Sequence, residues 1–413
     1  MKKRVVITGL GVISPVGNDV ASFWQSLKDG KNGVGPITSF DATAFDSRIA
    51  AEIKNFDPTR YGISLKDVKR TAKFVQYAVA AAKQAIESSG LDLSKEDRNR
   101  IGVIIGSGIG SLHTIEEEHK ILLNKGPSRL SPFLIPMLIV NEASGLVAIM
   151  HGLKGPNSCV ATACASGSHA IGEAYRTILY GDADIMVTGG TESCIVPTAV
   201  GGFCALRALS TKNDQPQKAS RPFDLERDGF VMAEGSGLVV LETLEHAQKR
   251  NANIIAEIVG FGMTCDAYHI TAPNPDGEGA ASAMTIAMKD ACLNPQDIDY
   301  INAHGTSTKL NDKIETLSMK KAFGNHSKKV MISSTKSMTG HLLGAAGGVE
   351  FLVCCLVIKD GVIPATINYE HPDPECDLDY VPNIARTVNV SVCMSNSLGF
   401  GGHNASLVVK KFK

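Results

Sequence analysis

The chain contains 413 residues, of which 44% are hydrophobic and 20% are charged, a composition typical of an ordered protein with a sizeable core. The 41 basic and 42 acidic side chains nearly balance, so the sequence lacks the basic excess of a protein that wraps nucleic acid. The length predicts roughly two or three domains.

Neither a membrane helix nor a secretory signal is indicated. The longest apolar run of note, residues 349–358, is far shorter than the roughly 20 residues that a membrane helix needs, so no membrane insertion is expected. The N-terminal run VVITG at 5–9 is too short for the apolar region of a signal and predicts a first buried strand. We therefore expect a cytoplasmic protein.

Short apolar strands alternate with helical stretches along the chain, which indicates an α/β fold. The clearest helical patterns cover residues 72–89 and 280–291. The predicted strands are 5–9, 101–107, 185–189, 237–241, 254–260, 298–303, 330–334 and 406–410.

An internal repeat suggests that the chain consists of two related α/β halves, 1–250 and 251–413. Cys164 and His341 each follow a threonine and a small residue, and each precedes a Gly- and Ala-rich helical segment. Aligning the two segments gives an offset of 177 residues. This alignment predicts that Cys164 and His341 lie at equivalent helix N-termini, one in each half.

Cys164 is the best candidate for a nucleophile among ten scattered cysteines, which show no CxxC motif and no His/Cys metal spacing. It lies where a strand-like run passes through small residues into a helix. Free amide N–H groups and the helix dipole at such a position stabilise a thiolate, and its own N–H can meet a developing oxyanion. A buried structural cysteine is the alternative, and the other nine cysteines keep that interpretation. No metal is expected.

Two histidines occur in turns rich in Gly, Ser and Thr, at positions where α/β sheets bind ligands. His304 follows a predicted strand, and His341 ends the run STKSMTGH. Lys336 lies five residues before His341 and is placed to tune a histidine or to hold a carboxylate. The run at 395–404 is predicted to be a flexible, amide-rich turn that supplies a second oxyanion donor.

The glycine-rich run at 106–110 follows a predicted strand and resembles a dinucleotide-binding loop. It does not complete GxGxxG, because Ser111 occupies the place of a glycine, and no acidic residue closes a following strand at the required distance. These glycines are instead expected to let the backbone approach an active-site wall or a subunit interface.

Four motifs in order over nearly the whole chain resemble those of the β-ketoacyl-acyl carrier protein synthases, most closely the type II synthases of dissociated bacterial fatty acid synthesis. The Cys-His-His pattern separates this branch from the one that uses Cys-His-Asn. Small departures occur at Lys309, where proline is usual, and at Ala233, where glycine is common. The motifs are ATACASG at 161–167, NAHGTST at 302–308, STKSMTGH at 334–341 and GFGG at 399–402.

The resemblance implies a thiolase-like fold in which two halves, each with a helix-covered five-stranded sheet, form a five-layer α-β-α-β-α sandwich and a homodimer. It also implies decarboxylative Claisen condensation of an acyl-Cys intermediate with malonyl-acyl carrier protein, which releases CO2 and elongates fatty acids. No cofactor of its own is implied, because the substrates bring the phosphopantetheine of acyl carrier protein.

Catalytic roles carried over from the family fall on four residues. Cys164 takes up the acyl chain as a thioester, and His304 and His341 stabilise the enolate-like oxygen as CO2 leaves. The N–H groups of Cys164 and Phe400 hold the oxyanion. Neutral histidines that donate N–H suit this role, because the stabilised charge is negative.

Supporting and binding roles follow from the same resemblance. Lys336 and Glu315 match residues that support the histidines, and Thr306 and Thr308 match hydroxyls that bind the pantetheine arm. Ile109 matches a residue of the acyl pocket near the dimer interface.

A basic surface is predicted to bind acyl carrier protein, which is strongly acidic. Lys66, Lys69, Arg70 and Lys73 have spacings of three, four and seven residues and are predicted to share one helix face. Arg207 matches a further docking position of the family. A solvated basic face without a partner is the alternative.

Two other functions remain open at this point. A cysteine acyltransferase or hydrolase needs a base beside Cys164, but it does not need two histidines and a lysine. A catalytically inactive partner subunit, such as a chain-length factor, lacks the nucleophile that is present here.

Overall fold

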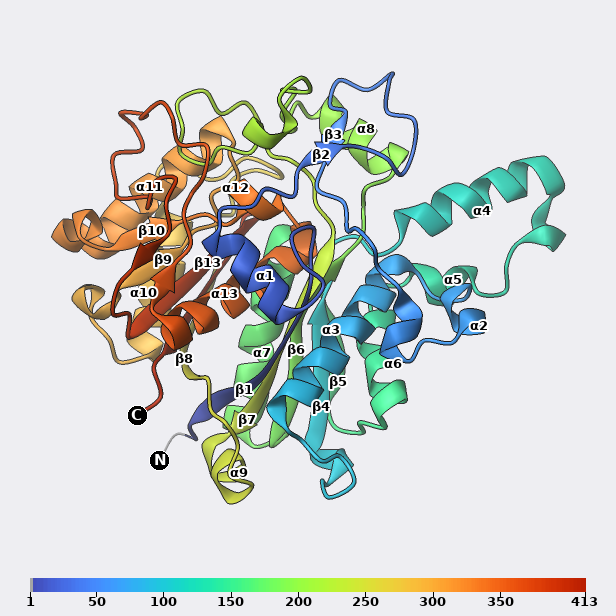
Figure 1. Cartoon of the computed structure of the whole chain (residues 1–413), viewed down its shortest axis with the longest axis horizontal. Coiled ribbons are helices and arrows are strands. Elements are labelled where there is room, and N and C mark those ends of the chain that lie inside the picture. Colours follow the sequence, from blue (N-terminus) through green and yellow to red (C-terminus); the bar gives the residue numbers. More distant parts are fainter. Residues whose placement is uncertain (1–2) are drawn as a thin grey trace.

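A computed structural model describes residues 3–413 and places ten strands in one mixed sheet (Figure 1). Five strands belong to the N-terminal half: β1 (Val5–Ile13), β4 (Ile101–Gly106), β5 (Asn157–Val160), β6 (Ile185–Glu192) and β7 (Gly235–Thr243). Five belong to the C-terminal half: β8 (Ala256–Cys265), β9 (Tyr300–Asn302), β10 (Met331–Ser333), β13 (Val392–Gly399) and β14 (His403–Lys410).

The two halves repeat the same strand arrangement. The order is β5-β4-β6-β7-β1 in the first half and β10-β9-β13-β14-β8 in the second. In both units the first two pairs are parallel and the last two are antiparallel. A short antiparallel pairing of β1 with β8 joins the units. The predicted internal repeat is therefore present in the topology.

The structure shows that the offset of the repeat is 180 residues rather than 177. A one-turn 3₁₀ helix precedes the central helix of each half, and these two turns, Ala163–Ala165 and Leu343–Ala345, lie 180 residues apart. The central helices, α7 (Ser166–Tyr180) and α13 (Ala346–Asp360), keep the same offset. Cys164 thus corresponds to Gly344, and His341 lies before the turn. The prediction that Cys164 and His341 are equivalent is wrong, because two short matches do not determine the length of the loop that carries His341.

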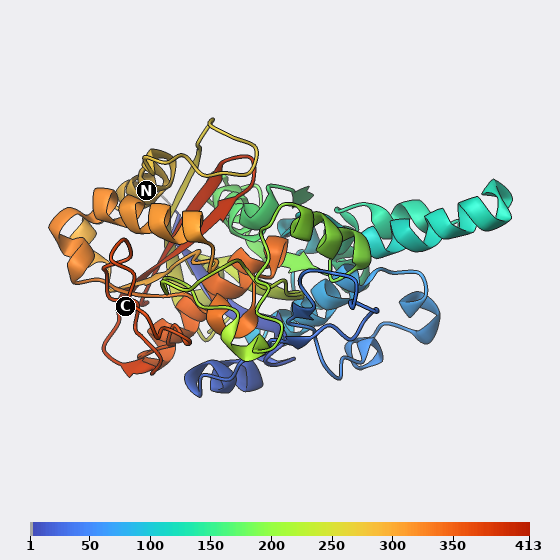
Figure 2. The same cartoon turned by 90° about the horizontal axis from the view of Figure 1, so that it is seen from above.

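Helices cover both sheet units and fill the space between them, which gives the five layers expected from the resemblance (Figures 1 and 2). The middle layer consists of α7 and α13, and α13 is buried over all residues except Lys359 and Asp360. A Cβ at Gly167 of α7 would lie 2.8 Å from the backbone nitrogen of Gly348, so glycine permits the close contact of the two helices. The outer layers are α3 (Lys73–Ser89) with α6 (Glu142–His151), and α10 (Glu278–Asp290) with α11 (Lys309–Phe323).

The remaining elements connect this framework. The other helices are α1 (Val20–Lys28), α2 (Leu65–Val68), α4 (Leu112–Lys125), α5 (Leu134–Leu138), α8 (Pro197–Ala205), α9 (Leu244–Lys249) and α12 (Lys336–Thr339). The minor strands are β2 (Gly35–Pro36), β3 (Ile49–Ala50), β11 (Val362–Ile363) and β12 (Arg386–Thr387). Within residues 3–413, no helix has both the length and the apolar character that crossing a bilayer requires.

Two local predictions are wrong. Most of the run 395–404 belongs to β13 and β14, and only 400–402 forms the turn between them. Some of its polar side chains are accommodated by partners elsewhere in the fold: Asn396 accepts the hydroxyl of Ser406 at 2.8 Å, and Ser397 shares a hydrogen bond with Ser168 of α7 at 2.8 Å. The basic segment 66–73 is not one helix, because α2 ends at Val68 and the extended backbone of Ala72 precedes α3.

Candidate active site

Cys164 lies in the tight turn between β5 and α7, at the carboxyl end of the parallel strands. Ala163 has a φ of 50°, a left-handed conformation that its small side chain tolerates. The half-buried Cys164 lines a cavity of about 470 Å³ between the two halves of the chain. The thiol is therefore presented to a space large enough for a substrate.

The protein surrounding Cys164 disfavours its charged form. Burial raises the pKa of the Cys164 thiol to about 12; Lys336 lowers this pKa, whereas Glu192 and Glu350 raise it. Burial thus favours the protonated thiol and opposes the stabilisation of a thiolate that is expected at a helix N-terminus. Proton loss has to accompany attack on the substrate.

The same cavity gathers most of the residues that the sequence singled out. Lys336 and Glu315 lie behind its wall, and the basic residues at 66–73 lie elsewhere on the surface. The predicted residues that line the cavity are Ile109, Cys164, Arg207, His304, Thr306, His341, Thr308 and Phe400.

The two histidines are neighbours with nearly perpendicular rings, whose centroids lie 5.2 Å apart. The ammonium of Lys336 lies 3.4 Å from Nδ1 of His304, and the backbone N–H of Leu343 donates to Nδ1 of His341 at 3.3 Å. Because a donor faces Nδ1 in both rings, each neutral ring carries its proton on Nε2. Both rings are consequently hydrogen-bond donors through Nε2.

Both histidines are held in the neutral form. Burial lowers the pKa of His304 well below its usual range, and the charges of Lys336 and His341 lower it further. Burial and Lys336 do the same to the pKa of His341. A neutral imidazole can donate a hydrogen bond from Nε2 to an oxygen that becomes negative. It carries no second, more acidic proton that it could transfer to that oxygen.

Behind the histidines, Lys336 forms a buried ion pair with Glu350, a residue to which the sequence analysis gave no role in the site. Glu315 accepts the backbone N–H groups of His304 and Gly305, each at 2.8 Å. Burial raises the pKa of Glu315 and of Glu350 to about 7. A sequence signal for Glu350 exists, since it is the one charged residue within the apolar run 349–358.

The turn after β13 packs directly against the Cys164 amide. A Cβ at Gly399 would lie 2.8 Å from the carbonyl oxygen of Thr162 and 3.3 Å from the nitrogen of Cys164. Phe400 follows at once, and its ring lies 6.4 Å from that of Phe203. The turn thus brings the backbone around Phe400 close to the amide of Cys164. An oxyanion site formed by the N–H groups of Cys164 and Phe400 requires this closeness.

Glu192 is a buried carboxylate of the cavity wall that the sequence analysis missed. It accepts hydrogen bonds from the N–H of Gly108 at 2.8 Å, the hydroxyl of Ser107 at 3.0 Å and the N–H of Gly344 at 3.1 Å. It therefore joins the glycine-rich run 106–110 to the second half of the chain. This agrees with the expectation that these glycines line an active-site wall.

Thr306 and Thr308 place two hydroxyls side by side on the cavity wall, with their oxygens 2.9 Å apart. Asp312 accepts the N–H of Thr306 at 3.0 Å. The pair therefore offers two adjacent hydroxyls to a polar group of a substrate in the same cavity as the histidines.

The fold and the site define a class of proteins, the condensing enzymes with two topologically equivalent halves and a Cys-His-His site. Models described as the N-terminal and C-terminal domains of β-ketoacyl synthase match residues 2–247 and 255–370. The chain belongs to the β-ketoacyl synthase family.

Relatives within this family extend over the whole chain. A 3-oxoacyl-(acyl-carrier-protein) synthase 2 of Synechocystis sp. is 54% identical over 100% of this chain and 99% of its own length. A crystal structure of a β-ketoacyl synthase from Burkholderia phymatum has a TM-score of 0.93 and 35% identity over 100% of both chains. A ketosynthase of a type II PKS, solved in complex with its acyl-carrier protein, has a TM-score of 0.93 and 36% identity, also over 100% of both chains.

These comparisons confirm the resemblance predicted from the motifs, including its assignment to the type II synthases. They also confirm the predictions of a thiolase-like fold and of a condensing enzyme of fatty acid elongation.

Proposed function

We propose that Cys164, His304 and His341 carry out a decarboxylative condensation in which an acyl chain on Cys164 is extended by two carbons from malonyl-acyl carrier protein. The observation that carries the proposal is that one cysteine and two neutral histidines, each with an Nε2 donor, line a single cavity.

In the first half-reaction the sulfur of Cys164 attacks the thioester carbonyl of acyl-acyl carrier protein. The carrier thiol leaves with the proton of Cys164, and the acyl-Cys thioester remains. The N–H groups of Cys164 and Phe400 hold the oxygen while it is negatively charged.

In the second half-reaction malonyl-acyl carrier protein occupies the cavity. The C–C bond to its carboxylate breaks, CO2 leaves, and the electron pair is delocalised onto the thioester oxygen. His304 and His341 donate their Nε2 protons in hydrogen bonds to that oxygen. The resulting carbanion attacks the acyl carbon, Cys164 leaves as a thiolate that regains a proton, and β-ketoacyl-acyl carrier protein is released.

The substrates supply the only prosthetic group in this proposal, the phosphopantetheine of acyl carrier protein. Thr306 and Thr308 bind this arm through their hydroxyls. Lys336 and Glu315 position His304, one at its Nδ1 and the other at its backbone N–H.

Acyl carrier protein docks on the basic surface formed by Lys66, Lys69, Arg70 and Lys73, and on Arg207. The three lysines are exposed although they do not share one helix, and Arg70 stacks on Phe133 with 4.6 Å between its guanidinium carbon and the ring centre. Arg207 is exposed and lines the cavity. The solved complex of a related ketosynthase with its acyl-carrier protein supports a partner of this kind.

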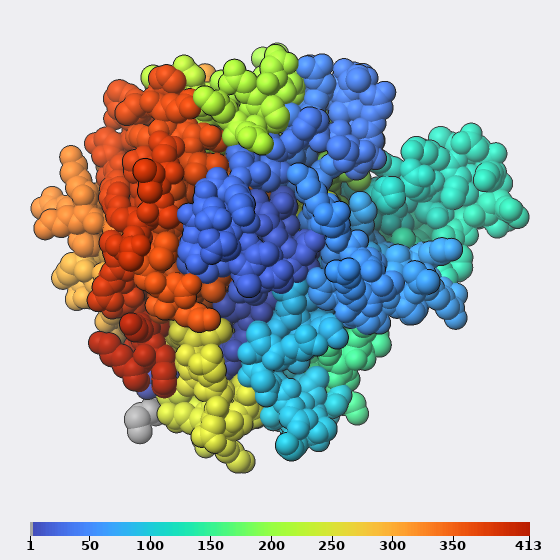
Figure 3. Space-filling view, in the orientation of Figure 1, coloured from blue at the N-terminus to red at the C-terminus, as the bar shows by residue number. Residues whose placement is uncertain are grey.

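The protein acts as a cytoplasmic homodimer, with a boundary between its two halves near residue 250. Two observations support the dimer. Strand β5 is the last strand of the sheet and is partly exposed, so its free edge is available for pairing. The arm formed by α4 and α5 projects from the body of the molecule and exposes Leu123 and Ile135 (Figures 2 and 3).

Release of CO2 tests the proposal directly. The purified protein is given acyl-acyl carrier protein and malonyl-acyl carrier protein labelled in the free carboxyl, and labelled CO2 and β-ketoacyl product are measured together. Equal amounts of both are expected. Acyl transfer or hydrolysis without CO2 would identify a cysteine acyltransferase or hydrolase, and absence of any acyl-enzyme would identify an inactive partner subunit.

A further inference from the structure

The loop that carries the two threonine hydroxyls, residues 306–309, is held largely by a segment from the other half of the chain, residues 221–229, and also by Asp312. The N–H of Arg221 donates to the hydroxyl of Ser307 at 2.9 Å, and the N–H of Gly229 donates to the carbonyl of Ser307 at 3.1 Å. Ser307 itself has a φ of 66°, an uncommon conformation that the surrounding contacts have to maintain.

Arg227 makes the largest contribution to this contact. Its side chain is only 3% exposed. Its Nε donates to the carbonyl of Thr308 and its Nη2 to the carbonyl of Lys309, both at 3.1 Å. One planar guanidinium therefore fixes two consecutive carbonyls of the loop at once.

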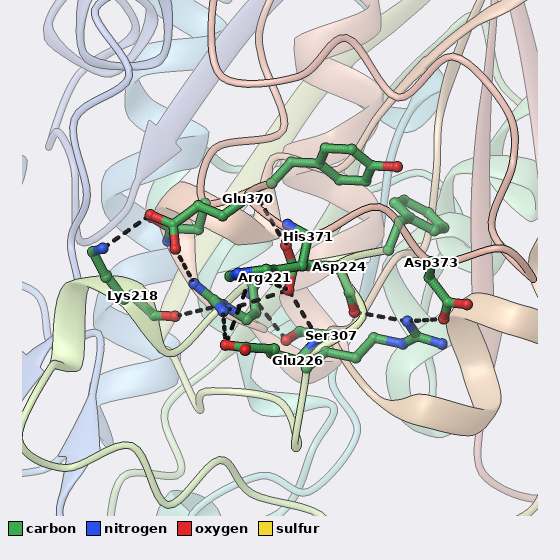
Figure 4. A network of polar contacts seen from close by, with 12 residues as sticks. Lys218, Arg221, Asp224, Glu226, Ser307, Glu370, His371 and Asp373 are labelled. Carbon is green, nitrogen blue, oxygen red and sulfur yellow. Dashed lines mark hydrogen bonds and ion pairs between the residues drawn. The ribbon is translucent and has the colours of Figure 1, made fainter.

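The other side of the same guanidinium is anchored in the protein. Its Nη1 donates to the carboxylate of Asp373 at 2.6 Å and to the carbonyl of Asp224 at 2.7 Å. Asp312 lies 3.7 Å from Nε and also accepts the N–H of Thr306. Figure 4 shows Asp373 at one end of this network and Arg221 with its acidic partners at the other.

We propose that Arg227 is a positioning residue for the pantetheine arm. By holding the carbonyls of Thr308 and Lys309, it keeps the hydroxyls of Thr306 and Thr308 side by side on the cavity wall. This inference rests on the proposed role of the two threonines in binding pantetheine.

Arg221 offers a matched control in the same network. Its side chain is also 3% exposed, and it bonds the carbonyl of Lys218 and the carboxylates of Asp224, Glu226 and Glu370 (Figure 4). None of these partners belongs to the loop 306–309, and the backbone N–H that reaches Ser307 survives any substitution of the side chain. Arg221→Met thus removes an equally buried guanidinium without releasing a loop carbonyl.

The experiment compares how fast two thioesters acylate Cys164, measured by mass spectrometry of the intact protein. Butyryl-pantetheine carries the whole arm, whereas S-ethyl thiobutyrate has the same reacting carbonyl and no arm. The ratio of the two rate constants reports recognition of the arm alone. A general folding defect lowers both rates and leaves the ratio unchanged.

We expect Arg227→Met to lower the ratio about tenfold, corresponding to two weakened hydrogen bonds, and to leave the rate with S-ethyl thiobutyrate unchanged. Arg221→Met is expected to keep the wild-type ratio. Adding Arg227→Met to the double variant Thr306→Val, Thr308→Val should cause no further loss, because the arginine acts through those hydroxyls.

Arg227→Lys keeps a buried cation opposite Asp373, but one ammonium cannot serve both loop carbonyls. It is the second variant if Arg227→Met does not fold, and an intermediate ratio is expected. A wild-type ratio in a folded Arg227 variant, or equal losses in the Arg221 and Arg227 variants, would overturn the inference. A wild-type ratio in the threonine double variant would instead show that the proposed role of the threonines is wrong.

Discussion

The ring of His341 stands almost at a right angle to that of His304, with an angle of 85° between their planes, and each ring has its Nδ1 occupied by a donor of the protein. This arrangement leaves both Nε2 protons free for the substrate. In the proposed mechanism, the pair serves an oxygen that becomes negative only during loss of CO2, and it does not serve the acylation of Cys164.

His304→Ala and His341→Ala are each expected to retain acylation of Cys164 and to lose decarboxylation of malonyl-acyl carrier protein by about 100- to 1,000-fold, the usual effect of removing one preorganised oxyanion donor. Release of CO2 and formation of the acyl-enzyme are measured separately. His403→Ala is the control, because this half-buried histidine lies beyond the cavity lining. Normal decarboxylation in either variant would contradict the assignment.

Cys164→Ala is expected to abolish the acyl-enzyme and to change the melting temperature little, because one sulfur is lost from a half-buried position at a helix start. Mass spectrometry after incubation with acyl-acyl carrier protein measures the thioester. Cys204→Ala removes another half-buried thiol from the neighbouring apolar cluster and should acylate normally. A thioester that persists in Cys164→Ala would assign the nucleophile to another residue.

Reversing the charge of Lys66, Lys69 and Lys73 to Glu is expected to raise KM for carrier-bound substrates about tenfold or more and to flatten the dependence of association on salt. Turnover of a pantetheine thioester, which lacks the acidic protein, should barely change. Steady-state kinetics with both substrates at two salt concentrations provide the test.

The matched control reverses three exposed lysines in the last turn of α11 and just after it, Lys321, Lys328 and Lys329; α11 and α2 lie on opposite sides of the molecule (Figure 1). This variant has the same net charge and should keep the wild-type KM. An equal rise in KM in both triple variants would point to net charge rather than to a docking surface.

Ile109→Phe is expected to spare short acyl chains and to exclude longer ones in a step. Ile109 lines the cavity and packs in one apolar cluster with Phe203 and Leu343, so a larger ring takes volume from the distal carbons of the chain. Each excluded methylene loses roughly 0.8 kcal/mol of burial, and steric overlap adds to the loss. Values of kcat/KM against acyl length measure the step.

Ile109→Ala provides the opposite change and should extend the accepted length. A uniform loss in Ile109→Phe at all lengths, including the shortest, would remove Ile109 from the pocket wall. The limit on chain length would then have to come from another residue of the cavity lining, such as Phe400.

His246 is expected to make stability depend on pH. It bonds Glu242 at 2.7 Å and Glu96 at 2.9 Å, and the hydrogen bond to Glu242, followed by that to Glu96, raises its pKa above the ordinary value. The protonated ring therefore stabilises the fold fully below about pH 6.5, the value of the unfolded chain, and this contribution is lost as pH rises through the higher folded pKa.

Urea unfolding at pH 6 and at pH 8.5 measures the effect. Between pH 6 and pH 8.5, the unfolding free energy of the wild type should fall by roughly 1.5 to 3 kcal/mol more than that of His246→Gln, the range of hydrogen bonds to charged groups. Glu96→Gln, which keeps the bond to Glu242, should show a smaller dependence. Parallel pH profiles for wild type and His246→Gln would refute the link.

Local signals in the sequence were sufficient for the framework and for the reacting groups. The eight predicted strands are all present, because short apolar runs between turns depend mainly on neighbouring residues. The motifs around Cys164, His304 and His341 likewise identified side chains that line one cavity. Two of the ten strands, β5 and β13, are absent from the predicted list. The Ser and Asn side chains of β13 resemble those of a turn, and its strand form depends on backbone pairing with β9 and β14.

Contacts between distant parts of the chain decided the protonation of the site residues and the partners that surround them. The tautomer of His304 depends on Lys336, and the burial of both neutral rings depends on packing that no short motif describes. Glu192 and Glu350 complete the site through partners 14 to 152 residues away. Lys66 and Lys73 belong to different helices because a turn after Val68 and the extended backbone of Ala72 separate α2 from α3. The sequence by itself determined which chemical groups are available, whereas the tertiary structure determined their protonation and their neighbours, since desolvation and hydrogen bonding act only once the two halves have packed together.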